Sequence, residues 1–292
     1  MDESSKIGVL GASSFVGECA IQRLRKDGRH IVACSRSLCD DKTEPDVTRL
    51  QLSPSVIASR EVPAIKEWVC VAPIWVLPEY FPLIEASGAH RVVALSSTSL
   101  LAKKDSSDQG EQALVHGLHA GEQALRTWAE ARGVEWVILR PTMIYGYGRD
   151  KNVTEILRFV RRWGFFPLLG CADGLRQPVH ADDVATACVS ALTVLAAGSR
   201  TYNLSGGETL SYREMVCRVF TAIGKIPHLV TIPRWLFRVA VATVRLLPRC
   251  RHWTAEMAER MNRDLVFDHA DAVRDLGFSP RGFRLSPQDL PV

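Results

Sequence analysis

The stretch that decides the fold is Ile7-Gly8-Val9-Leu10-Gly11-Ala12-Ser13-Ser14-Phe15-Val16-Gly17. Its apolar start, Ile7 to Leu10, predicts a short buried strand, and the apolar spacing from Val16 to Leu24 predicts a helix. A pyrophosphate can bind between them, because the unpaired N–H groups of a helix N-terminus carry partial positive charge. Gly11 suits the tight turn, and Gly17 suits close packing of the helix on the strand. The alternative is an ordinary strand-to-helix turn.

The composition is that of a globular protein with one large α/β domain, or one domain with a small appendage. Of 292 residues, 47% are hydrophobic and 23% charged, and the net charge of +4 is too small to indicate nucleic-acid binding. The eight cysteines are scattered without a C-x-x-C pair, which indicates reduced thiols in a cytoplasmic protein and no metal site. We find no signal peptide, and no uncharged apolar run approaches the ~20 residues of a membrane span.

Further buried runs predict an alternating α/β chain and hence a parallel sheet. The predicted strands are 30–35, 68–74, 91–95 and 136–139, and the main helices are 78–86, 110–132, 152–162 (capped by Asn152) and 182–195. In such sheets ligands bind at the carboxyl ends of the strands. The turn at Gly11, the Ala72-Pro73 edge and the cluster Ser96 to Ser99 are therefore expected to line one crevice.

The end of the second strand, Ser35-Arg36, bears on the choice of cofactor. An acidic residue there would bind a ribose 2′-hydroxyl, whereas a basic residue suits a 2′-phosphate. We therefore favour NADP over NAD. The alternatives are that Arg36 is a solvated loop charge, or that it stacks on adenine without choosing.

Several motifs along the chain resemble the NAD-dependent epimerase/dehydratase branch of the short-chain dehydrogenase/reductase superfamily. They are the turn Gly11 to Gly17, Ser96-Ser97-Thr98, Leu139-Arg140-Pro141-Thr142 with Ile144-Tyr145-Gly146, Pro178 to Val184, Tyr202 to Gly207, and Asp275 to Pro280.

The resemblance implies a Rossmann-type doubly wound parallel sheet with a small mixed C-terminal substrate domain. The expected division is a dinucleotide-binding domain at 1–170, with strands returning from about 175–205, and a mainly helical substrate domain at 206–292. It also implies a nucleotide-sugar substrate. The expected cofactor-binding residues are Gly11, Ser13, Ser14, Phe15, Val16, Gly17, Ser35, Arg36, Ala72, Pro73, Ser96 and Pro141.

Two departures from the family pattern concern the chemistry. Ser14 stands where the family's glycine turn has its third glycine, and narrows the approach to a pyrophosphate, although its hydroxyl could donate to one. The family's Tyr-x-x-x-Lys pair, aligned through Glu122, falls on Leu114 and Leu118. The ordinary acid/base is therefore missing, and of the catalytic set only the serine/threonine member is matched, by Thr98.

Other residues are candidates for the missing roles. Tyr145 is the second catalytic candidate, with a substrate-lining or structural role as the alternative. His116 and His119 share a helix face, but a surface role is favoured over catalysis. His180 is expected to be structural. Arg176 is a candidate for binding a substrate diphosphate, with Arg149 as the second; the alternative for Arg176 is a solvent-facing arginine.

The stretch 234–251 is apolar with arginines at 234, 238 and 245, which form one basic stripe on a helix. Such a helix can lie on an anionic membrane, although a core or dimer-forming helix is the favoured interpretation. Two functions stay open. The first is an NAD(P)-dependent oxidoreductase or epimerase acting on a nucleotide sugar or related glycosyl substrate. The second is a non-catalytic NADP-binding sensor or assembly factor.

Overall fold

A computed structural model describes residues 6–36, 44–53, 63–194, 197–233 and 260–291. The chain divides into two compact units: Met1–Thr142 with Ala181–Leu204 and Asp268–Ser279, and Met143–His180 with Ser205–Phe267 and Pro280–Val292. The chain leaves the first unit after Thr142 and re-enters it twice. The division into a cofactor domain at 1–170 and a substrate domain at 206–292 stays a prediction. The stretch 234–251 lies outside the described residues.

The first unit contains one parallel sheet of seven strands. Its order is β11 (Arg200–Leu204), β6 (Glu135–Pro141), β5 (Arg91–Leu95), β4 (Glu67–Cys70), β1 (Ile7–Leu10), β2 (Ile31–Ser35) and β3 (Val47–Gln51). The strand order reverses between β1 and β4. All residues of β1, β2 and β5 are buried, as expected for a sheet covered on both faces. The predicted Rossmann-type sheet is confirmed.

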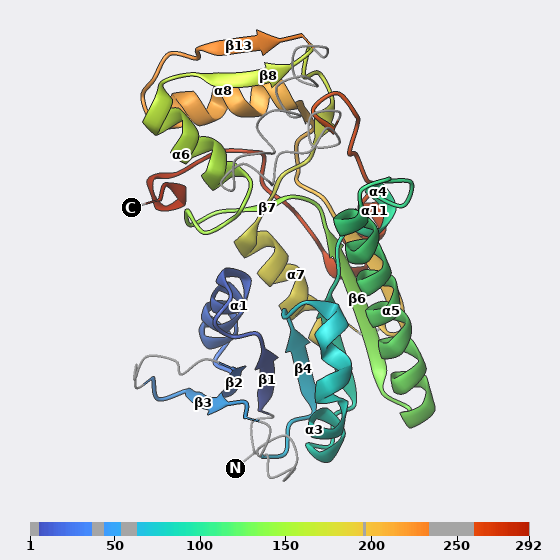
Figure 1. The fold of residues 1–292 in the computed structure, drawn as a ribbon. Helices are drawn as coiled ribbons and strands as arrows, with labels where there is room; N and C mark the ends of the chain where they lie inside the picture. The colour runs from blue at the N-terminus through green and yellow to red at the C-terminus, as the bar shows by residue number, and fades with distance from the viewer. Residues whose placement is uncertain (1–5, 37–43, 54–62, 195–196, 234–259, 292) are drawn as a thin grey trace. The chain divides into compact units, whose positions relative to one another are not determined.

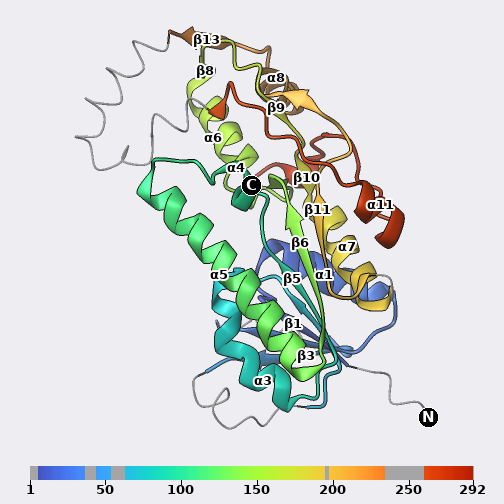
Figure 2. The ribbon, with the colours of Figure 1, turned by 90° about the vertical axis from the view of Figure 1, so that its right-hand side faces the viewer.

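Helices cover both faces of this sheet (Figures 1 and 2). On one face α1 (Phe15–Lys26) packs against α7 (Ala181–Thr193). On the other lie η1 (Ile74–Tyr80), α3 (Phe81–Ala86) and α5 (Gln109–Arg132), whose apolar residues form one core with the strands. The short α4 (Ser99–Ala102) follows β5, and α11 (Ala270–Leu276) joins β11 through the Tyr202 hydroxyl, which donates to Asp275 at 3.0 Å.

In its described residues, the second unit combines two helices with three strand pairs. Its helices are α6 (Val153–Trp163) and α8 (Tyr212–Ala222), which share a core with Phe166 and Phe283. The strand pairs are β8 (Phe166–Leu169) with β13 (Leu229–Ile232), β9 (Leu175–Arg176) with β12 (Leu210–Ser211), and β7 (Ile144–Tyr145) with β10 (Val179–His180); the 3-10 turn η4 (Pro287–Asp289) closes the chain.

Local sequence signals predicted some helix ends better than others. The bounds of α5 match the prediction of 110–132, with Asp108 accepting from the Glu111 N–H at 2.9 Å. The predicted cap at Asn152 is wrong, because its side chain makes no capping hydrogen bond. Asp150 takes this role, since its carboxylate accepts from the N–H groups of Asn152 and Thr154 at 2.8 and 3.2 Å.

Candidate functional site

A cavity of about 230 Å³ lies in the first unit where the strand order reverses. It opens at the carboxyl ends of β1, β2 and β4, the place where open α/β sheets bind ligands. Its polar lining comes from the turn after β1 and from the end of β2, and its apolar lining includes Leu52, directly after β3, and residues of η1. The lining residues are Leu10, Gly11, Ser13, Ser14, Cys34, Ser35, Arg36, Leu52, Val71, Ala72, Pro73, Val76 and Tyr80.

The two glycines of the turn are required by geometry. Gly11 has a φ of 86°, and a Cβ there would lie 2.7 Å from the backbone nitrogen of Ala72. A Cβ on Gly17 would lie 2.4 Å from the carbonyl oxygen of Gly11. Ser14 caps α1, since its hydroxyl oxygen accepts from the Gly17 N–H at 3.0 Å. The serine that departs from the glycine pattern therefore stabilises the helix whose N-terminus faces the cavity.

The cavity brings together seven of the twelve predicted cofactor residues: Gly11, Ser13, Ser14, Ser35, Arg36, Ala72 and Pro73. Phe15, Val16 and Gly17 belong to the first turn of α1 and do not line it. Neither do Ser96 and Pro141, which are buried at the ends of β5 and β6. Their assignment to cofactor binding stays a prediction.

Sequence reasoning missed the apolar lining, above all Tyr80. This tyrosine is buried in the core at the end of η1 and lines the cavity beside Leu52 and Val76. Burial raises the pKa of its phenol, and the nearby Arg36 charge opposes that rise. No motif marks Tyr80, because it reaches the cavity only through the fold of η1 against the sheet.

Thr98, the first catalytic candidate, lies at the start of α4 and is buried. Its hydroxyl donates to the carbonyl oxygen of Pro141 at 3.1 Å, and its backbone N–H donates to the same oxygen. The threonine therefore ties the end of β5 to the end of β6. A substrate oxygen would have to compete with this bond.

The leucines at the positions of the absent Tyr-x-x-x-Lys pair belong to the apolar core. Leu118 is fully part of the core with Ile74 and Leu77, and Leu114 packs against it. His116 and His119 are exposed on α5. This part of α5 therefore presents no titratable group to the core of the first unit.

One turn further along α5, Glu122 is the centre of a buried polar network. Its carboxylate accepts from the Ser96 hydroxyl at 2.7 Å, from Arg140 Nε at 2.8 Å and from Arg126 at 2.8 Å. Burial would raise the pKa of Glu122, but the bonds from Arg140 and Ser96 and the two arginine charges outweigh it and lower the pKa. The network joins the ends of β5 and β6 to α5, and the Glu122 carboxyl group in it is ionised.

The remaining predicted residues belong to the second unit. Tyr145 is fully buried, and its ring packs edge-on against His180 and Phe283. Arg176 is buried rather than solvent-facing, and its guanidinium donates to the carbonyl oxygens of Leu175, Arg260 and Arg263. Arg149 is exposed. The phosphate-binding role of both arginines stays a prediction. Arg176 also stabilises the second unit through its hydrogen bonds to the three carbonyl oxygens.

His180 and Asp289 form a buried pair that holds the end of the chain to β7 and β10. His180 Nε2 lies 3.0 Å from Asp289 Oδ1, which also accepts from the Tyr147 N–H at 3.1 Å. The second carboxylate oxygen accepts from the Ser286 N–H and hydroxyl at 2.8 and 2.7 Å. His180 is therefore engaged in a structural contact, as the motif predicted.

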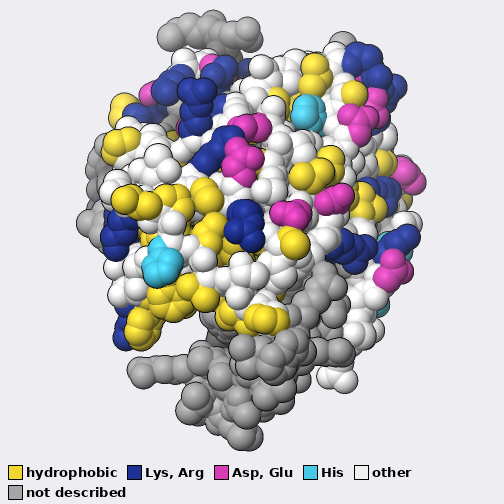
Figure 3. Space-filling view, turned by 90° about the horizontal axis from the view of Figure 1, so that it is seen from above, with side chains coloured by type: hydrophobic (Ala, Val, Ile, Leu, Met, Phe, Trp, Pro, Cys, Tyr) yellow, Lys and Arg dark blue, Asp and Glu magenta, His cyan; other side chains and the backbone are white. Residues whose placement is uncertain are grey.

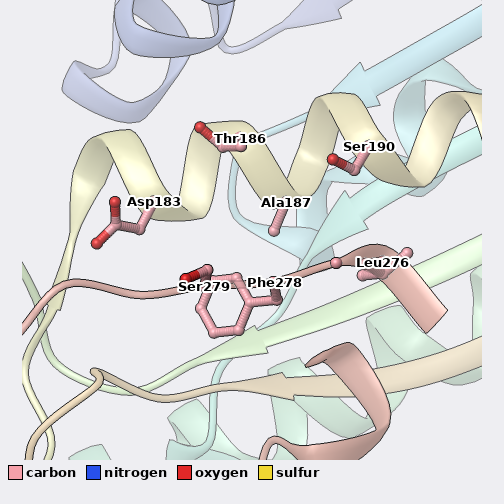
Figure 4. Close-up of a pocket in the computed structure, with 8 residues that line it drawn as sticks. Asp183, Thr186, Ala187, Ser190, Leu276, Phe278 and Ser279 are labelled. Carbon is pink, nitrogen blue, oxygen red and sulfur yellow. The ribbon is translucent and has the colours of Figure 1, made fainter. Parts of the chain in front are cut away.

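A second cavity of about 170 Å³ lies between α7 and the end of α11 in the first unit (Figure 4). Asp183, Thr186 and Ser190 line it from α7, and Phe278 and Ser279 line it from the other side. Within the described residues no cluster of three or more His, Cys, Asp or Glu side chains suits a metal ion. The same residues contain no helix that is long and apolar enough to cross a bilayer.

A parallel sheet with reversed strand order, a glycine turn at the reversal and a cavity beside it define the Rossmann class of nucleotide-binding folds. Residues 81–205 match the model of the NAD dependent epimerase/dehydratase family. The resemblance to this family that the motifs predicted is therefore confirmed over that part of the chain.

Individual relatives are distant. An uncharacterized protein, y4nG, of Sinorhizobium fredii is 30% identical over 56% of this chain and 40% of its own length. A protein of Arabidopsis thaliana named NADH dehydrogenase [ubiquinone] 1 alpha subcomplex subunit 9, mitochondrial, is 26% identical over 54% of this chain and 42% of its own length. The matched parts are thus about two fifths of these relatives.

The fold is shared with solved structures over nearly the whole chain. The structure of MoeE5 in complex with UDP-glucose and NAD has a TM-score of 0.69 and 21% identity, and the match covers 97% of this chain and 95% of that one. At this identity the likeness concerns the fold.

Proposed function

We propose that the protein binds a nicotinamide dinucleotide and acts as an oxidoreductase or epimerase on a nucleotide sugar or a related glycosyl substrate. The observation that carries the proposal is the cavity at the strand reversal, where Gly11 lets the turn after β1 approach the backbone of Ala72. The cavity suits the adenosine half of a dinucleotide, because it has a polar turn on one side for phosphate and apolar side chains on the other for adenine. The family match and the UDP-glucose and NAD in the MoeE5 structure support the reaction class.

In this proposal different residues in and beside the cavity contact different parts of the cofactor. The N–H groups of Phe15 and Val16 at the start of α1 hold the pyrophosphate, since those of Ser14 and Gly17 already donate within the turn. Ser14 can donate its hydroxyl hydrogen, because its oxygen accepts from Gly17. Arg36 pairs with a 2′-phosphate, which favours NADP. Leu52, Val76 and Tyr80 form the apolar lining for adenine.

The bound nicotinamide would supply hydride transfer. Thr98 would position the substrate oxygen, and Tyr145, in the second unit, is the proposed acid/base. Arg149 and Arg176 are the proposed contacts of a substrate diphosphate. We propose further that the first unit serves as the cofactor domain and the second as the substrate domain.

Calorimetric titration with NADPH and NADH tests the first step. We expect binding of NADPH that is tighter than that of NADH by about tenfold, and an Arg36→Ala variant in which the difference disappears, as for one charge-assisted contact. If circular dichroism shows that the chain is folded and it binds neither dinucleotide, the proposed enzymatic function is excluded. A chain that binds both equally would remove only the preference.

A second function, a non-catalytic cofactor-binding subunit or sensor, is favoured by one specific observation. The positions of the family's acid/base pair are leucines packed into the core, and the Thr98 hydroxyl is bonded to Pro141. The Arabidopsis relative is named as a subunit of a larger enzyme, which agrees with this alternative.

Turnover distinguishes the two functions. With UDP-glucose and bound cofactor, the enzyme should change the absorbance of the nicotinamide ring or yield an epimerised sugar nucleotide. Loss of that activity in Thr98→Ala and Tyr145→Phe would support catalysis. Cofactor binding without turnover of any of a panel of sugar nucleotides would support the subunit or sensor.

A further inference from the structure

Exposed apolar side chains of the second unit gather where α6 ends beside the loop that leads into β13. Trp163, the last residue of α6, is 56% exposed, Ile226 is 89% exposed, and Val230 in β13 is 39% exposed. Exposed hydrophobics that lie together, unlike scattered ones, mark interaction sites.

Hydrogen bonds, a ring contact and strand pairing place these elements side by side. Lys225 Nζ donates to the carbonyl oxygens of Val160 and Arg161 at 3.3 and 3.4 Å, and so holds the loop against the end of α6. The Phe165 ring lies 6.3 Å from the His228 ring, and Val230 is paired with Pro167 across β13 and β8. We call Arg161, Arg162, Trp163, Lys225, Ile226 and Val230 the Trp163 surface.

The charge of this surface has one sign. Neither of the two stretches that build it, 156–172 and 215–233, contains an aspartate or glutamate. Arg161, Arg162 and Lys225 are exposed, whereas Arg158 and Arg218 pair with glutamates outside these stretches. The Arg162 guanidinium lies 5.2 Å above the Trp163 ring. Figure 3, which views the molecule from above the view of Figure 1, shows hydrophobic and basic side chains side by side on part of this face, with acidic side chains elsewhere on it.

We propose that the Trp163 surface docks on an anionic phospholipid membrane. Tryptophan prefers the boundary between headgroups and acyl chains, and isoleucine can insert below it. Lysine and arginine lie flat with apolar stems toward the lipid and charges toward the phosphates. An acidic protein partner would suit the cations, but it would leave the highly exposed Ile226 and Trp163 without an apolar counterpart. The inference is independent of the proposed catalysis.

Co-sedimentation of the full chain with vesicles tests this surface. We expect binding to phosphatidylcholine vesicles that contain phosphatidylserine, weaker binding to phosphatidylcholine alone, and weakening by salt. The double variant Trp163→Ser/Ile226→Ser should lose binding about tenfold or more, because two apolar side chains no longer enter the lipid. Lys225→Glu should bind at least about fivefold more weakly, because it replaces a cation near the anionic headgroups by an anion and also breaks the bonds that hold the loop against α6.

The matched control is Trp75→Ser, which removes a tryptophan that is 45% exposed in the first unit and should leave vesicle binding unchanged. A second control changes Arg234, Arg238 and Arg245 to glutamate in the basic stretch predicted from sequence. Three results would each overturn the proposal. The wild-type chain could bind neither kind of vesicle, or the double variant could bind as tightly as the wild type. The third result is that only the arginine variant loses binding. Circular dichroism confirms that each variant is folded.

Discussion

Replacing Asp289 by alanine tests how the end of the chain is held in the second unit. The carboxylate is buried and accepts from the N–H groups of Tyr147 and Ser286, from the Ser286 hydroxyl and, in the protonated or Nε2–H form, from His180. Hydrogen bonds to a charged acceptor contribute about 1.5–3 kcal/mol each and are not additive. Because Asp289→Ala leaves buried donors unpaired, we expect a loss of about 3–5 kcal/mol of unfolding free energy.

The same carboxylate makes this loss depend on pH. Burial raises the pKa of Asp289, but the bonds from His180, Ser286 and Tyr147 outweigh it and hold the pKa well below its usual range. A carboxyl whose pKa is lower in the folded than in the unfolded chain stabilises above its unfolded pKa of about 4 and stops doing so as the pH falls further. The wild type should therefore lose this contribution in acid, and the difference from the variant should shrink below about pH 4.

Thermal unfolding and hydrogen exchange of residues 143–148 together provide the measurement, since exchange reports the second unit locally. Glu155→Ala is the matched control, because Glu155 is exposed and its pair with Arg158 contributes at most about 1 kcal/mol. If Asp289→Ala were no less stable than this control at neutral pH, or if its difference from the wild type did not change with pH, the account of the buried pair would be refuted.

Three further predictions concern the first unit. Glu122→Gln should lower the unfolding free energy by about 3–5 kcal/mol, because Arg140 keeps its charge without its ionised partner, and urea unfolding at neutral pH measures it. Tyr80→Phe should weaken NADH and NADPH equally, by about two- to tenfold, if the phenol contacts the base; loss for NADPH alone would place it at the 2′-phosphate instead. Gly17→Ala should abolish dinucleotide binding, since its Cβ would lie 2.4 Å from the Gly11 carbonyl oxygen. An unchanged affinity by calorimetry would contradict the proposal that this turn binds the pyrophosphate.

Local patterns predicted the sheet and the polar part of its cavity. The buried runs around Val9, Val69 and Val93 could only pair as central strands, and the strand ends then had to meet at one edge. Ser35 and Arg36 line the cavity for this reason, because Ser35 is the last residue of β2 and Arg36 directly follows it.

Contacts between distant parts of the chain could not be predicted in this way. Asp289 meets His180 across 109 positions, and two of the three carbonyl partners of Arg176 lie 84 and 87 positions away. Nothing in the local sequence distinguishes an arginine that binds a phosphate from one that binds backbone oxygens. The Asp150 cap was missed for a simpler reason, since Asn152 stands nearer to the helix and is also a common capping residue.

The division of the chain between the units has a consequence for biosynthesis. β6 lies beside β11, so the sheet has an open edge at β6 until residue 204 has left the ribosome, and α11 joins β11 only after residue 276. A nascent chain that ends anywhere in the second unit's first segment, residues 143–180, therefore carries an unpaired strand edge. Chaperones protect intermediates of this kind. Because each unit is built from separate segments of the chain, a single proteolytic cut cannot release either unit intact.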